Sequence, residues 1–177
     1  MQVRQALKGA LEQAEAGDGG LAAMLEACAD YLVNSMGRLD LTDMNIHDLL
    51  KERVPQDNAE VHEALGVLSA RQDKARAETA ALAAALETYR KDGRADFAAF
   101  DRALRQYHAV VSGMMTPRKN PFSPYTDKLF TFEDWTNIAE ASPDTVSAED
   151  RLFDAITAAA PKDLKPESFS GTHGMRP

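Results

Sequence analysis

The chain has 177 residues, of which 44% are hydrophobic and 27% are charged, and its formal net charge at pH 7 is −8. This is the profile of one globular domain with appendages, and the acidic balance argues against nucleic-acid binding, which requires a basic face. No run of about 18 apolar residues is present, so no membrane span is expected.

The cysteine content and the N-terminus indicate a compartment. Cys28 is the only cysteine and cannot form an internal disulfide, which fits a reducing environment. The first residues lead into a polar helix without the apolar segment of a signal peptide. A cytoplasmic location is therefore expected. Because Cys28 falls at an apolar helical position, we expect its thiol to be buried and inert.

Alanine-rich segments and the near absence of β-branched runs predict an all-α fold. Residues 2–16 carry small and medium apolar side chains at three- and four-residue steps, which predicts a short amphipathic helix. The glycine-rich turn 17–20 ends it. This helix is expected to pack on its own bundle, with docking on another protein as the alternative.

A long helix is expected over about 21–53. Its apolar residues form a near-heptad seam: Leu21, Leu25, Cys28, Leu32, Met36 and Leu39. Pro55 ends it, and amphipathic helices follow over about 58–91 and 94–115. Short connections between long helices favour antiparallel neighbours, so we expect an up-down helical bundle. The seam would serve an intramolecular bundle or a homodimer equally well.

The segment after this bundle has a different composition. Residues 116–124 are rich in proline and basic, and Ser123 followed by Pro124 predicts the cap of a short helix that reaches Phe130. The run Thr131-Phe132-Glu133-Asp134 resembles a capping box, which would open a second short helix.

The remaining chain is expected to form one more helix and a tail. Residues 142–144 are expected to form a turn, and Ser147 is expected to cap a helix that ends near Ala160. The tail 161–177 has no periodicity and is expected to be an arm or disordered. The domain organisation is then residues 1–20 as a helix and turn, 21–140 as the bundle, and 141–177 as a C-terminal helix and tail.

Four residues could hold a metal ion. Asp43 and His47 lie one helical turn apart, a spacing at which a carboxylate and an imidazole share a divalent cation or act as an acid–base pair. Antiparallel pairing of the helices would bring His62 to a similar height, and His108 would be compatible with it. The candidate ligand set is therefore Asp43, His47, His62 and His108, with a solvated polar patch as the alternative.

A second candidate site would bind an anion or an acidic partner. Arg118, Lys119 and Asn120 lie in the proline-flanked loop ahead of a helix N-terminus, where a phosphate or carboxylate could be held. A loop whose charges face water is the alternative. Trp135, the only tryptophan, is expected to anchor the short helices on the bundle, and contact with a partner is its alternative role.

Two runs carry a family resemblance. Leu-Thr-Asp-Met-Asn-Ile-His-Asp-Leu-Leu at 41–50 resembles the first metal-bearing helix of hemerythrin-like (HHE cation-binding) domains. The run 100–130 resembles their last helix. The resemblance covers about residues 21–130, rests on helix order and apolar spacing, and implies a hemerythrin-like helical bundle.

The chain departs from that family at the metal ligands. Asp43 stands where a histidine is expected, Gln72 is the nearest residue to a later histidine position, and residues 115–120 contain neither the final histidine nor the final glutamate. The resemblance therefore implies a bundle with a degenerate metal site. Any metal bound here would need the rearranged set that includes Asp43 and His47.

The expected function is that of a non-enzymatic binding, regulatory or accessory protein with a protein partner or a homo-oligomeric state, and no cofactor is expected. The alternative is a non-haem iron protein that binds or senses oxygen or nitric oxide through the candidate ligand set. That alternative predicts bound iron and a charge-transfer band that is lost in His47→Ala or His62→Ala. A third hypothesis is an enzyme that uses Asp43 and His47 without a metal.

Overall fold

The computed structural model describes residues 2–17, 19–114, 122–139 and 142–166, and within these residues every regular element is helical. The α-helices are α1 (Gln2–Gln13), α2 (Ala22–Arg53), α3 (Ala59–Lys91), α4 (Phe97–Met114), α5 (Ser123–Leu129), α6 (Phe132–Ala139) and α7 (Pro143–Ala159). Two 3₁₀ turns are η1 (Gly19–Leu21) and η2 (Lys162–Leu164). The all-α prediction is confirmed.

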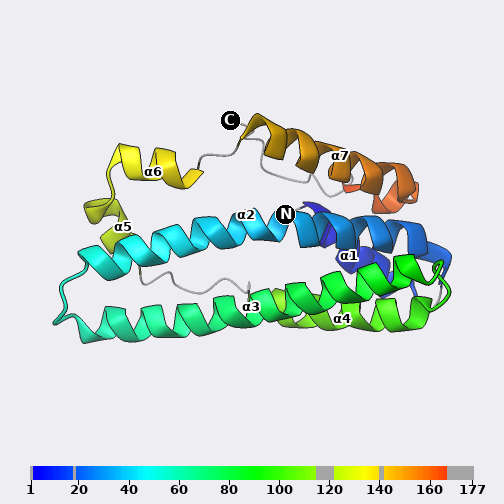
Figure 1. Cartoon of the computed structure of the whole chain (residues 1–177), viewed down its shortest axis with the longest axis horizontal. Coiled ribbons are helices and arrows are strands. Elements are labelled where there is room, and N and C mark those ends of the chain that lie inside the picture. The colour runs from blue at the N-terminus through cyan, green and yellow to red at the C-terminus, as the bar shows by residue number, and fades with distance from the viewer. Residues whose placement is uncertain (1, 18, 115–121, 140–141, 167–177) are drawn as a thin grey trace.

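The long helices α2 and α3 form an antiparallel hairpin that runs the length of the molecule (Figure 1). Helix α4 returns along α3, and α7 lies along α2. The short helices α5 and α6 lie near the C-terminal end of α2, while α1 packs near its N-terminal half. None of the helices within the described ranges is long and apolar enough to cross a membrane.

Two hydrophobic clusters hold the hairpin at its two ends. The larger joins α1, α2, α3, α4 and α7 and contains the predicted seam residues Leu25, Cys28 and Leu32, each at most 3% exposed. The smaller consists of Leu50, Val54, Val61 and Leu65, with side chains of α5 packed against it. Burial raises the pKa of the Cys28 thiol to about 12, which keeps it protonated and unreactive, as expected.

Helix α1 packs on its own bundle, the first of the two predicted roles. Its apolar stripe, including Leu7 and Ala10, is buried in the larger cluster. An arginine of α4 closes the end of α1: the Arg105 guanidinium donates to the carbonyl oxygens of Leu11 at 2.9 Å and Ala14 at 2.8 Å. These contacts satisfy carbonyls that the helix end would otherwise leave without partners.

The turn between α3 and α4 takes more residues than the sequence predicts. Gly93 and Arg94 adopt φ of 64° and 65°, and the Arg94 N–H donates to the carbonyl of Tyr89 at 2.8 Å. Because two successive left-handed residues end α3, α4 cannot begin at residue 94. It begins at Phe97, after Asp96, whose carboxylate accepts from the N–H of Ala99 at 3.0 Å.

Two predicted helix starts are wrong. Helix α7 begins at Pro143 rather than near Ser147, because Ser142 accepts from the Thr145 N–H at 3.1 Å and proline suits the first helical position. In α5 the cap is Phe122, since Ser123 is already helical.

The predicted capping box at the start of α6 is confirmed. The Asp134 N–H donates to the Thr131 hydroxyl at 3.2 Å, and the Thr131 N–H donates to the Asp134 carboxylate at 2.7 Å.

The start of the predicted tail is ordered. Leu164 in η2 is 2% exposed and belongs to the larger cluster, and the Gln13 amide donates to Asp163 at 3.2 Å. Apolar burial against α1 therefore replaces the expected arm over residues 161–166. Residues 167–177 lie outside the described part of the chain.

Candidate functional site

The structure separates His47 from His62. The ion pairs of Asp40 with Arg76 and of Glu26 with Arg90 show which residues of α2 and α3 lie level with each other. In that register His62 lies level with Val54, seven residues beyond His47, so the two imidazoles are on the order of 10 Å apart along the hairpin. The expectation that they lie at a similar height is wrong, because the connection from 54 to 58 is short and places the start of α3 at the end of α2.

The two imidazoles also face local partners. His47 Nδ1 lies 3.2 Å from the Asp48 carboxylate, and His62 Nε2 lies 3.2 Å from the Pro55 carbonyl oxygen. Asp43 is exposed on α2, where partial desolvation and, as a smaller cause, the charge of Asp40 raise its pKa. These contacts orient each side chain locally rather than toward a common point.

His108 lies on the opposite side of His47 from His62, toward the N-terminal half of α2. The Tyr89 ring of α3 stacks on Phe100 of α4 at 4.9 Å between ring centres, and this register places His108 roughly 18 Å from the level of His47. Tyr107 takes the core position and is 2% exposed. His108 is turned aside toward Ser112, 3.3 Å from its hydroxyl, and burial with the nearby Lys8 lowers its pKa.

The candidate ligands Asp43, His47, His62 and His108 are therefore not brought together. Within the ranges that the structure describes, no three His, Cys, Asp or Glu side chains are grouped to hold a metal ion. Gln72 is buried on α3, and its Nε2 has no hydrogen-bond partner in the described structure. Arg118, Lys119 and Asn120 lie outside the described residues.

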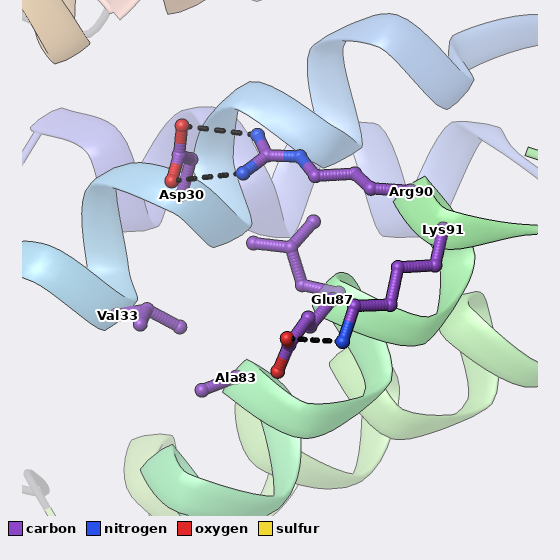
Figure 2. Close-up of a pocket in the computed structure, with 7 residues that line it drawn as sticks. Asp30, Val33, Ala83, Glu87, Arg90 and Lys91 are labelled. Atoms are coloured by element: carbon purple, nitrogen blue, oxygen red, sulfur yellow. Dashed lines mark hydrogen bonds and ion pairs between the residues drawn. The ribbon is translucent and has the colours of Figure 1, made fainter. Parts of the chain in front are cut away.

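A groove between α2 and α3 has a volume of about 380 Å³. Figure 2 shows Arg90 reaching from α3 to Asp30 of α2, 3.0 Å away, while Lys91 pairs with Glu87 of its own helix at 2.6 Å. Val33 and Ala83 supply apolar lining. Since these charges are paired with one another, the groove offers a ligand little electrostatic attraction.

A larger hollow of about 690 Å³ adjoins it where α2 begins, α3 ends and α7 ends. Glu26, with a side chain 11% exposed, accepts from Arg94 at 2.7 Å and from Arg90 at 2.8 Å. The two hydrogen bonds from Arg94, helped by the one from Arg90, lower the pKa of Glu26 although burial opposes them. The two arginines thus hold the hairpin together at this end.

The most unusual surface is an aromatic corner, formed by Phe130, Phe132 and Trp135. The Phe130 and Trp135 rings lie 5.2 Å apart between centres, and the Arg53 guanidinium sits 5.8 Å from the centre of the Phe130 ring. Phe132 is 88% exposed and Trp135 is 41% exposed. Large apolar side chains that face water as a group mark contact sites, whereas single ones are ordinary on a protein surface.

The aromatic corner is held in place by a bidentate ion pair. The two outer nitrogens of Arg53, at the end of α2, donate to the two carboxylate oxygens of Asp134 in α6 at 2.6 and 2.8 Å. Arg53 also donates to the Leu129 carbonyl at 2.8 Å. Parallel hydrogen bonds of this kind fix geometry as well as charge, so α6 presents its aromatic residues in one orientation.

Acid should break the Arg53–Asp134 ion pair and so loosen the contact between α6 and α2. The hydrogen bonds from Arg53 and, after them, from Thr131 hold the pKa of Asp134 far below its usual range. A depressed pKa contributes stability above the ordinary aspartate range, and this contribution is lost as the pH falls below about 4 toward the lowered pKa. We expect the emission of Trp135 to shift to longer wavelength in wild type only in acid.

The comparison uses Asp134→Asn, which should show the shifted emission already at pH 7. Asp127→Asn, at an exposed position of α5, is the control and should follow wild type. Identical emission of Asp134→Asn and wild type at pH 7 would show that the ion pair does not orient α6.

A third concavity, the α2–α6 groove, has a volume of about 300 Å³ and lies between these two helices. Leu49 and Ile138 are its apolar lining residues, and its polar lining residues are Asn45, Asp48, Glu52, Asp134 and Asn137. Three predicted site residues lie near this groove: Trp135 is two residues from Asn137 on α6, His47 contacts Asp48 at 3.2 Å, and Asp43 is two residues from Asn45 on α2.

Sequence reasoning missed Phe132 and Arg53. Phe132 lies within the predicted capping box, and a place in such a box does not predict whether the ring is buried. Arg53 ends α2 and meets Asp134 at a separation of 81 residues, which no local pattern reveals. Comparison of the chain with known protein families, with curated proteins and with solved structures found no match.

Proposed function

We propose that this chain is a non-enzymatic accessory protein, a helical bundle that binds a partner protein through the aromatic corner. The observation that carries the proposal is the 88% exposure of Phe132 on a helix whose orientation is fixed by the Arg53–Asp134 pair. A phenylalanine that faces water gains nothing for folding, whereas burying it against a partner is worth about 2 kcal/mol.

The rigid mounting supports this role. Interface anchors are commonly aromatic side chains, and affinity rises when they are held in the bound orientation before the partner arrives. The capping box of Thr131 and Asp134 and the ion pair with Arg53 supply that preorganisation. The partly exposed Trp135 ring beside Phe130 extends the apolar surface.

The hemerythrin-like type of the bundle belongs to the same proposal. Its support is the resemblance over residues 21–130 together with the consecutive antiparallel helices α2, α3 and α4. A degenerate metal site fits the scattered positions of Asp43, His47, His62 and His108. No contact among the described residues favours the alternative of an iron protein that binds oxygen or nitric oxide.

Phe132→Ser tests the proposal, because it removes the exposed ring and should leave stability within about 0.5 kcal/mol. Immobilised wild-type and variant proteins are incubated with lysate of the source cells, and the retained proteins are quantified by mass spectrometry. We expect at least one partner that wild type retains about tenfold or more above Phe132→Ser, since hot-spot losses reach about 2 kcal/mol.

Val146→Ser is the matched control, because Val146 is an exposed apolar residue, 48% exposed, on α7. It should retain the same partners as wild type. Equal retention by wild type and Phe132→Ser would reject the aromatic corner as the docking surface.

A further inference from the structure

We infer that the partner segment is a cationic amphipathic one, which covers the aromatic corner with apolar side chains and places a lysine or arginine in the α2–α6 groove. This inference rests on the proposed function and specifies its partner. Two neighbouring features carry the inference. One is the set of exposed aromatic rings, and the other is a groove with apolar side chains inside and carboxylates at its edge.

The groove has room for a long side chain. Its volume of about 300 Å³ exceeds that of a lysine or arginine side chain, and Leu49 and Ile138 provide apolar contact for the methylene groups. Ile138 is 7% exposed and fixes that side of the groove. The carboxamides of Asn45 and Asn137 supply further hydrogen-bond acceptors for a cationic head.

The acidic edge is only partly neutralised by the protein itself, because the charge of Arg53 acts on the neighbouring Glu52. Asp48 lies 3.2 Å from the imidazole of His47, and its side chain is 72% exposed. Among the described residues no lysine or arginine forms an ion pair with Glu52, which lies one turn beyond Asp48. Like charges at this spacing repel each other and destabilise a helix, and a cation between them would relieve that repulsion.

The groove and the aromatic corner belong to one helix. Asp134 and Ile138, four residues apart, lie on the side of α6 that faces α2, and Phe132 and Trp135, three residues apart, share another side. Because α6 has only eight residues, a partner segment that lies across this helix can contact both the aromatic corner and the α2–α6 groove.

Charge complementarity selects this occupant over two others. A second copy of the chain also carries a net charge of −8 and would bring an identical acidic groove to the contact. An anionic membrane surface would be repelled by Asp48 and Glu52 for the same reason. A cationic amphipathic segment satisfies both the apolar and the acidic part of the surface.

The probe is an 18-residue amphipathic peptide of leucine and lysine without tryptophan, compared with the same peptide in which glutamate replaces lysine. Because Trp135 is the only tryptophan, its fluorescence reports binding at the aromatic corner directly. We expect wild type to bind the leucine–lysine peptide, and Asp48→Asn/Glu52→Gln to bind it about tenfold more weakly.

Asp150→Asn/Asp154→Asn is the matched control, with the same spacing, the same change in net charge and exposed positions on α7. It should bind within about twofold of wild type. Equal weakening by both pairs would mean unspecific attraction and would overturn the inference. Failure of wild type to bind the leucine–lysine peptide, or equal binding of the glutamate peptide, would overturn it as well.

The inference and the proposed function fail separately. If Phe132→Ser loses its lysate partner while Asp48→Asn/Glu52→Gln retains that partner and the peptide, the docking function stands and the cationic partner is rejected. If Phe132→Ser retains every lysate partner, the docking function is rejected whatever the peptides show.

Discussion

Replacing Phe100 with alanine should lower the free energy of unfolding by about 3–5 kcal/mol. Phe100 is 1% exposed in the larger cluster, stacks on Tyr89 at 4.9 Å between ring centres, and contacts Phe97 at 6.1 Å. Removing the ring loses its transfer free energy, leaves a cavity among α2, α3 and α4, and ends an aromatic pair worth roughly 1 kcal/mol beyond burial.

Urea unfolding followed by the helical circular dichroism signal measures this loss. Phe132→Ala makes the same chemical change at an 88% exposed position and should stay within about 0.5 kcal/mol of wild type. Similar losses for Phe100→Ala and Phe132→Ala would contradict the burial pattern on which both the core and the aromatic corner depend.

Arg105→Ala should lower the free energy of unfolding by about 2–4 kcal/mol, because it leaves two sets of polar groups without their hydrogen-bond partner. Asp101 is 2% exposed and receives hydrogen bonds from Arg105 Nε at 2.9 Å and from the Gly17 N–H at 2.9 Å. Without Arg105, a buried carboxylate loses its counter-charge. The carbonyls of Leu11 and Ala14 at the end of α1 lose their donor.

Hydrogen exchange separates the local from the global part of this effect, since the amides of α1 should lose protection before those of α2 and α3. Asp101→Ala/Arg105→Ala should be more stable than the sum of the two single changes predicts, because it leaves no unpaired charge. Arg102→Ala, an exposed neighbour on α4, is the control. A loss below about 0.5 kcal/mol for Arg105→Ala would show that α1 is not secured by this contact.

Local signals in the sequence located most helices within a few residues. Pro55 and Asn58 bracket the connection of α2 to α3, and the Asn58 side chain accepts from the Val61 N–H at 3.3 Å. Such caps depend on residues within one turn, so the sequence contains the whole interaction. The start of α7 was misjudged because Ser142 and Ser147 both offer a cap, and Pro143 decides between them.

The candidate site was predicted less well, because it depends on register. Asp43 and His47 were placed correctly on one helix, but their meeting with His62 and His108 required a helix alignment other than the one that the ion pairs of Arg76 and Arg90 show. Those pairs join residues 36 and 64 positions apart. A pattern with the period of one helix says which side chains share a face and says nothing about their height opposite another helix.

The sequence alone determined the all-α class, most of the helix ends to within a few residues, and the burial of residues such as Leu25 and Cys28, because periodicity and capping are local. Only the tertiary structure decided which polar groups meet. It separated the histidines, joined Arg53 to Asp134, and left Phe132 facing water beside an acidic groove. Whether a side chain is exposed, and which charge it pairs with, depends on its neighbours in space, and those neighbours come from distant parts of the chain.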